Sequence, residues 1–178
     1  MKSLEDKLGH LLKDVAYLKA TAKSVNLIGR SANKAQIISL PNIYPAGLPC
    51  KSSAEVEALE NFLKNSNTET RKLFFQGLLQ LGGSKPGDII REVLRTLLSN
   101  RAALEYSYQG EGPNNKAFQP LLICDMTLNV VRANPQYHEY TSNSFKVIVE
   151  NWLRNANKRL VTEGKNRRRA PARAADYV

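Results

Sequence analysis

The chain has 178 residues, and its 26 Lys and Arg outnumber its 16 Asp and Glu, so the formal net charge is +10. This length favours one domain with appendages or two small domains, and an apolar content of 42% excludes wholesale disorder. No apolar run approaches the roughly 18 residues that cross a bilayer, and acidic residues interrupt the N-terminal segment where a signal peptide is apolar. We therefore expect a soluble intracellular protein that has no membrane partner.

The positive charge is concentrated toward the C-terminus. Residues 1–45 carry seven bases and three acids, and residues 46–112 carry eight of each. Residues 146–173 carry nine bases against two acids. Such a basic end attracts nucleic acid, anionic lipid or an acidic protein, because all three gain when charge is neutralised and counterions are released.

The N-terminal segment, residues 1–28, has the heptad spacing of a coiled coil. Its apolar positions are Leu4, Leu8, Leu11, Val15, Leu18, Ala22 and Val25. We expect an amphipathic helix over residues 3–28 that self-associates through these side chains. A surface helix packed back on the core is the alternative, since three heptads is short for an independent dimer.

Residues 29–50 are predicted to be an extended linker, because Pro41, Pro45 and Pro49 punctuate them. The globular part, residues 51–163, is expected to follow as a compact bundle of about five helices. No 20 to 50 residue repeat, alternation of strands with helices, or hairpin signal is present, and the predicted fold class is therefore all-α.

The first helices of the bundle carry recognisable start and stop signals. Ser52 followed by Glu55 is a capping-box signature, and Thr68 is expected to cap the second helix. Gly82 and Gly83 are expected to stop that second helix. A broadly apolar third helix over residues 88–100 is predicted to be the central one.

The second half of the bundle is predicted from shorter patterns. Residues 101–108 suggest a short helix that ends in a Gly-rich loop, and a buried helix is expected to open near Phe118. Thr141 or Ser142 is expected to cap a last helix, which runs to Leu160. Residues 164–178 have almost no apolar content and are expected to form a disordered basic tail.

No arrangement of nucleophile and base is recognisable. His10 is predicted on the N-terminal helix and His138 in a loop, both as solvated side chains. Cys124 is expected to be a small core residue with a raised pKa, and Cys50 has only Lys51 nearby to activate it. With two His and two Cys no zinc-ligand cluster is expected, so we predict no metal and no cofactor.

Other features associated with catalysis have structural explanations. The spacing around Gly82-Gly83-Ser84-Lys85 does not match a phosphate-binding loop, and a helix stop explains the glycines better. Glu55, Glu57 and Glu60 lie in the first turns of a predicted helix, where we expect them to face water and favour the helix dipole. We therefore predict that the chain is not an enzyme.

The last helix is the most informative element. Its apolar face, with Trp152 as anchor, is expected to dock on the bundle and leave basic and amide side chains outward, where they bond phosphates and base edges. The predicted nucleic-acid-binding residues are Lys146, Asn151, Arg154, Asn155, Lys158, Arg159, Lys165, Arg167, Arg168 and Arg169. A solvated basic face without a ligand is the alternative. The basic cluster at residues 165–169 also matches a nuclear localisation signal or a phosphate-binding arm.

Four stretches between Leu48 and Arg132 carry a family resemblance. In order they are LPCKSSAEVEALENFL, LLQLGG, IIREVLRTLLSNRAALEYSYQG and KAFQPL. Their order and spacing resemble a domain family of unknown function that is found in many arthropod and other animal proteins, some of them associated with transposons. The resemblance covers about half of the chain.

The same helix order is also similar to the BEN domain, an all-α module that binds DNA in chromatin factors. A helix like Ile89–Leu98, a short helix, a Ser-x-x-Gly turn at Ser107–Gly110 and a helix that ends in Val130-Val131 carry this similarity. It implies that a closing basic helix contacts DNA, here at Lys146, Asn151, Arg154, Lys158 and Arg159. It transfers no base-reading residue.

These observations predict a nuclear, chromatin-associated protein that binds duplex DNA as an oligomer and regulates transcription. Other nuclear proteins are further partners on this view. Two alternatives stay open: an assembly adaptor whose heptad helix and bundle bind protein partners, and an RNA-binding protein. The RNA alternative lacks exposed aromatics along the basic helix, with only Tyr137 and Tyr140 nearby.

Overall fold

The fold is taken from a computed structural model, which describes residues 40–44, 46–112 and 115–169. The predicted heptad helix over residues 3–28 and the end of the basic tail, residues 170–178, lie outside this part of the chain. The elements are α2 (Leu40–Ile43), α3 (Ser53–Asn65), α4 (Thr68–Leu79), α5 (Pro86–Leu97), α6 (Asn100–Ala103), β1 (Tyr106–Ser107), β2 (Lys116–Ala117), α7 (Leu122–Arg132), a 3-10 turn (Pro135–Tyr137), α8 (Ser142–Arg154) and α9 (Ala156–Arg169).

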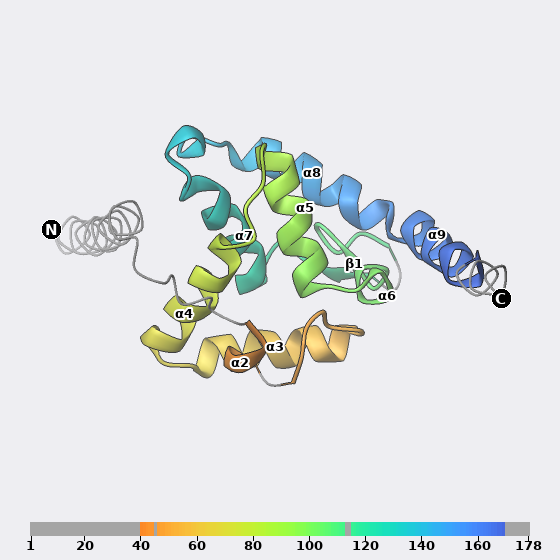
Figure 1. Cartoon of the computed structure of the whole chain (residues 1–178), viewed down its shortest axis with the longest axis horizontal. Coiled ribbons are helices and arrows are strands. Elements are labelled where there is room, and N and C mark those ends of the chain that lie inside the picture. The colour runs from red at the N-terminus through yellow and green to blue at the C-terminus, as the bar shows by residue number, and fades with distance from the viewer. Residues whose placement is uncertain (1–39, 45, 113–114, 170–178) are drawn as a thin grey trace, which may run out of the picture. The chain divides into compact units, whose positions relative to one another are not determined.

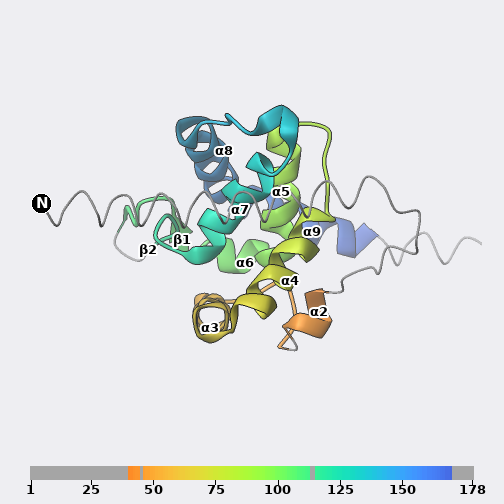
Figure 2. The ribbon, with the colours of Figure 1, turned by 90° about the vertical axis from the view of Figure 1, so that its left-hand side faces the viewer.

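Helix α5 is central, as predicted. Its apolar residues Ile90, Val93 and Leu94 are fully buried, and the helix packs against both α7 and α8. Figures 1 and 2 show α5 and α7 between α8 on one side and α3 on the other. The wide apolar surface of α5 is buried because helices cover it from two directions.

Local capping residues set most of the helix starts. The Ser52 hydroxyl accepts from the Glu55 backbone N–H at 3.3 Å, which confirms half of the predicted capping box. The Glu55 carboxylate accepts from the Lys51 backbone N–H at 2.7 Å. In a full capping box this carboxylate would accept from the backbone N–H of Ser52, the cap residue. The cap of α4 is Asn67, one residue before the predicted Thr68, because its side-chain oxygen accepts from the Thr70 N–H at 2.7 Å.

Helix α7 is capped from a distant part of the chain. It begins at Leu122, and its own N-cap residue, Leu121, makes no side-chain cap bond. The Glu60 carboxylate of α3 accepts from the Leu122 N–H at 2.9 Å and from the Ile123 N–H at 2.8 Å. The expectation that Glu60 faces water was wrong, since the residue is only 3% exposed. Two free helix N–H groups explain why a carboxylate is buried there.

The chain is mostly helical, with one small exception to the predicted all-α class. Helix α6 ends at Ala103, and the following residues form β1, which pairs in parallel with β2. The pairing aligns Tyr106 with Lys116, and the Tyr106 ring meets Phe118 edge to face at 6.0 Å between centroids. The predicted short helix over residues 101–108 is therefore half as long, because its second half joins a distant strand.

The predicted linker contributes to the core in its described part. Leu40 and Tyr44 are buried at α2, and the Tyr44 ring lies 5.2 Å from that of Phe62. Cys50 is fully buried, and its backbone donates to Leu97 and accepts from Ser99, both at 2.9 Å. From Leu40 onward this segment is therefore part of the folded unit and not an extended linker.

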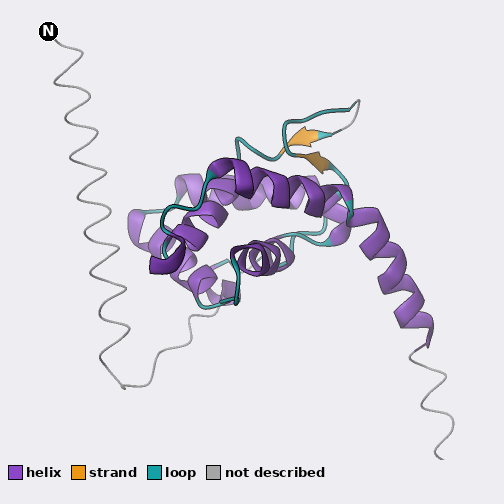
Figure 3. Ribbon diagram, turned by 90° about the horizontal axis from the view of Figure 1, so that it is seen from above, coloured by secondary structure: helices purple, strands orange, loops and turns teal. Residues whose placement is uncertain are grey.

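The predicted last helix is two helices. Helix α8 ends at Arg154, and Asn155, with φ −89° and ψ 7°, separates it from α9. The Asn155 side-chain amide donates to the Asn151 carbonyl at 2.8 Å, a local bond that competes with the helical ladder. Helix α9 then continues past Gly164 to Arg169, where a disordered tail was expected. Figures 1 and 3 show the C-terminal part of α9 projecting beyond the other helices.

Candidate nucleic-acid interface

The end of α8 and the described side chains of α9 include several of the exposed basic residues that the sequence predicted. Arg154, Lys158 and Lys165 are exposed, and so is Asn151. The Arg154 guanidinium is 3.5 Å from the Asn151 side-chain oxygen, and no acidic partner is recorded for it among the described residues. These three cations are placed to meet an anionic ligand.

Arg159 has a structural role, which corrects its prediction as an outward DNA contact. Its Nε donates to the Asn100 side-chain oxygen and its Nη1 to the Trp152 carbonyl, both at 2.6 Å. The guanidinium also lies 4.1 Å from the centre of the Trp152 ring, a cation–π distance. Burial and the neighbouring Arg95 lower the pKa of Arg159, and Glu163 opposes the shift. Arg159 therefore binds α9 to α6 and α8.

Two more predicted contacts are engaged within the protein. Lys146 is half-buried, with its ammonium 3.6 Å from the Glu150 carboxylate and 5.8 Å from the centre of the Tyr108 ring. Asn155 is half-buried and uses its amide nitrogen at the break between the helices. Both side chains are therefore engaged in contacts within the protein.

Arg167, Arg168 and Arg169 lie on the last turns of α9, and their side chains are outside the described part of the structure. The predicted oligomerisation residues Leu4, Leu8, Leu11, Val15, Leu18 and Val25 are outside it as well. Only Lys146, Asn151, Arg154, Asn155, Lys158, Arg159 and Lys165 can thus be compared with the prediction.

Sequence reasoning missed Arg101. This residue is exposed on α6, and α6 packs against α9. The Asn100 side chain next to it donates to the Glu163 carboxylate of α9. No local pattern links residues 100 and 163, so only the packing of the two helices indicates that Arg101 belongs beside the basic helix.

A cavity of about 300 Å³ lies beside Arg154. It is formed by the end of α6, by β1 and the residues that follow it, and by α8. The lining residues are Ala103, Leu104, Tyr106, Ser107, Tyr108, Gln109, Glu111, Asn115, Glu150, Leu153 and Arg154. The hydroxyl oxygen of Ser107 is buried and has no hydrogen-bond partner within the described structure.

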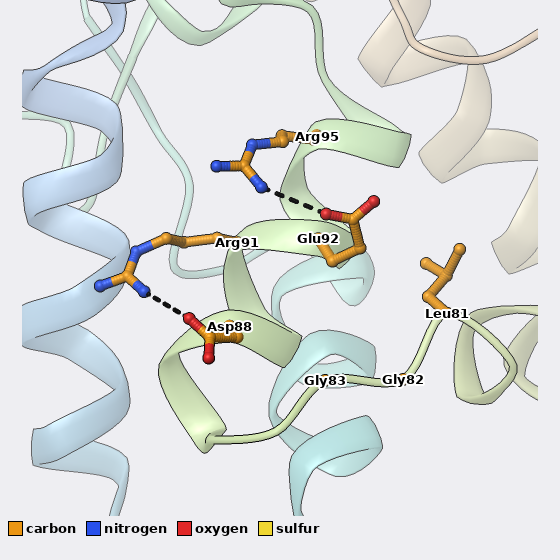
Figure 4. Close-up of a pocket in the computed structure, with 7 residues that line it drawn as sticks. All are labelled: Leu81, Gly82, Gly83, Asp88, Arg91, Glu92 and Arg95. Atoms are coloured by element: carbon orange, nitrogen blue, oxygen red, sulfur yellow. Dashed lines mark hydrogen bonds and ion pairs between the residues drawn. The ribbon is translucent and has the colours of Figure 1, made fainter.

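A second cavity, of about 420 Å³, is associated with the two glycines after α4. Figure 4 shows Arg91 and Arg95 of α5 turned toward acids of their own helix. Arg91 bonds Asp88 and Arg95 bonds Glu92, each at 3.1 Å, and the Ser84 hydroxyl donates to Asp88 at the same distance. These cations are already neutralised, so the glycine loop is not arranged to bind phosphate.

Neither cysteine is activated. Cys50 and Cys124 are buried, and burial raises the pKa of Cys50 to about 11 and that of Cys124 to about 12. Thiols with such values stay protonated near neutral pH and are poor nucleophiles. Among the described residues, no group of three or more His, Cys, Asp or Glu is placed to hold a metal ion. No described helix has the length and apolar character needed to span a bilayer.

Comparisons of the chain with protein-family models, with curated proteins and with solved structures found no match. The resemblances drawn from the sequence motifs therefore stay predictions.

Proposed function

We propose that this chain is a non-enzymatic, chromatin-associated nuclear protein that binds duplex DNA through α9 and the end of α8. The observation that carries the proposal is the charge of α9 together with its position. Helix α9 holds six bases against one acid in 14 residues; its first turns pack on α6 and α8, and its C-terminal part projects from the body of the protein. At 1.5 Å per residue it is about 21 Å long, and the major groove is about 12 Å wide, enough to admit a helix.

The exposed residues have distinct roles in this proposal. Arg154, Lys158 and Lys165 neutralise phosphates and supply sequence-independent affinity. Asn151 supplies an amide of the kind that bonds adenine edges. Arg159 holds α9 in place and makes no contact with DNA. Self-association through the coiled coil predicted for residues 3–28 would double these contacts.

The salt dependence of binding tests the proposal. In the full chain, we would replace Arg154, Lys158 and Lys165 together with Ala and measure affinity for a duplex over a range of salt concentrations. If each cation contacts one phosphate, the slope of log affinity against log salt becomes shallower by about 2.7, at roughly 0.9 per contact. An unchanged slope would remove this surface from the interface.

A matched variant separates local contacts from overall charge. Lys51, Lys72 and Lys85 are also exposed, and they lie before α3, on α4 and before α5. Their replacement with Ala removes the same net charge and should leave the slope near that of the parent chain. An equal loss in both triple variants would mean that only net charge matters.

The relative affinity for duplex DNA, single-stranded DNA and RNA distinguishes the alternative functions. Tighter binding to RNA or to single-stranded DNA than to the duplex would favour the RNA-binding function. Removal of residues 1–28 should weaken duplex binding without abolishing it. If that truncation removes protein complexes and the parent chain binds no duplex, the assembly adaptor is the better description.

A further inference from the structure

We propose that the 300 Å³ cavity beside Arg154 accepts one unpaired nucleobase of the bound DNA. This inference rests on the proposed function, because it assigns the cavity to the same ligand. Arg154 belongs both to the wall of the cavity and to the exposed basic surface. A strand held by that surface therefore passes the opening.

The charges around the cavity balance, which favours a neutral occupant. The Lys146 ammonium lies 3.6 Å from the Glu150 carboxylate, and the wall also holds Glu111 and Arg154. Two acids against two bases give little advantage to a small free anion or a free cation. A nucleobase is uncharged, and its phosphate stays outside, where Arg154 and Lys158 are exposed.

The side chains of the wall are of the kinds that bind bases. Tyr108 is half-buried and presents an aromatic ring, and aromatic rings stack on unpaired bases. Gln109 and Asn115 are exposed amides at the rim, and amides bond base edges. Asn115 donates its amide nitrogen to the Glu111 carbonyl at 2.9 Å, which leaves its side-chain oxygen as an acceptor.

The size of the cavity agrees with this occupant. Its volume is at the low end of the roughly 300 to 1,000 Å³ that is typical of ligand pockets, which suits a single small planar group.

A base that is paired within a duplex cannot enter the cavity. Only a bulged, frayed or flipped base is available, and unstacking costs least when the base is already unpaired. The full chain should therefore bind a duplex with one bulged nucleotide about tenfold tighter than the same duplex fully paired, the order expected for one stacked base.

The test compares these two DNAs with the parent chain and two variants. Replacement of Gln109 and Asn115 with Ala removes the bonds to the base edge but keeps the Tyr108 ring, so it should reduce the preference for the bulge severalfold and leave affinity for the paired duplex unchanged. The matched control replaces Asn61 and Asn65, two exposed amides on α3, and should keep the preference.

The outcomes separate the two proposals. Equal binding of both DNAs by the parent chain overturns the base pocket and leaves duplex binding intact. A preference that is undiminished in the Gln109 and Asn115 variant, or that falls equally in the Asn61 and Asn65 control, overturns it too. Failure to bind either DNA refutes the proposed function itself, and the base pocket with it.

Discussion

Glu60 offers the sharpest test of how the helices are held together. Its carboxylate lies on α3, is 3% exposed, and accepts the N–H groups of Leu122 and Ile123 at the start of α7. In Glu60→Ala both N–H groups lose their partner, the Ile123 group in a buried place and the Leu122 group in a part-buried one. A buried donor left unpaired costs about 1–3 kcal/mol, so the loss of both bonds should lower the free energy of unfolding by about 2–6 kcal/mol.

Two further variants show which part of the interaction matters. Glu60→Gln keeps one acceptor oxygen and leaves one N–H unpaired, so it should cost about 1–3 kcal/mol. Lys64→Ala removes the ion pair at 3.4 Å but leaves the cap intact. Since the Lys64 side chain is 56% exposed, its loss should cost at most about 1 kcal/mol.

Urea unfolding of the full chain measures these differences. Trp152 is the one tryptophan of the sequence and is buried, so its fluorescence reports the loss of tertiary packing. With a slope of about 1–3 kcal/mol per molar urea, Glu60→Ala should lower the midpoint by at least about 0.7 M. A cost below 1 kcal/mol would refute the capping argument. Lys64→Ala as damaging as Glu60→Ala would show that the ion pair carries the stability.

The glycine after α4 and the buried thiols give two more predictions. Gly83→Ala places a Cβ 2.7 Å from the Ile89 side chain at φ +151°, so it should cost about 1–3 kcal/mol in thermal unfolding. Gly47→Ala, at φ +91° in open space, should cost less, and equal costs would exclude the contact as the cause. Burial raises the pKa of Cys50 and Cys124 from 9.0 to about 11 and 12, so above pH 9 the unfolded chain loses thiol protons that the folded chain keeps. Stability should therefore fall as pH rises from 9 to 11, by up to about 1.4 kcal/mol per pH unit for each thiol. Urea midpoints at pH 8 and pH 10 measure this fall, which should shrink when both cysteines are replaced with Ala and would contradict the argument if it did not.

The features that depend on neighbouring residues were predictable. Ser52 caps α3 because its hydroxyl reaches an N–H only three residues away. The apolar spacing of α5 predicted its central position, because a helix with such a broad apolar face must be covered from more than one side. The boundaries were less accurate, since Asn67 and the adjacent Thr68 are both residue types that cap helices, and the sequence does not show which of them accepts the first N–H.

The features that depend on distant residues were not predictable. Glu60 follows the pattern of an acidic, solvated helix start, and only the approach of α7 gives its carboxylate two donors. Tyr106 and Lys116 pair as strands because a loop returns the chain to that position. A two-residue strand leaves no periodicity in the sequence, so its pairing is visible only in three dimensions.

The structural role of Arg159 reduces the number of cations on α9 that are free to bind a ligand. Successive helical residues differ by about 100° in direction, so the adjacent Lys158 and Arg159 cannot share a face. Arg159 lies in the first turn of α9, just after the break at Asn155, and it donates back to the Trp152 carbonyl of α8, so it is on the docked side even though its charge suggests the solvent. The guanidinium is accordingly bonded to Asn100 and stacked on Trp152, while Lys158 is exposed. Contacts with a buried anchor therefore distinguish a cation that serves the fold from one that can neutralise a phosphate, and net charge alone does not.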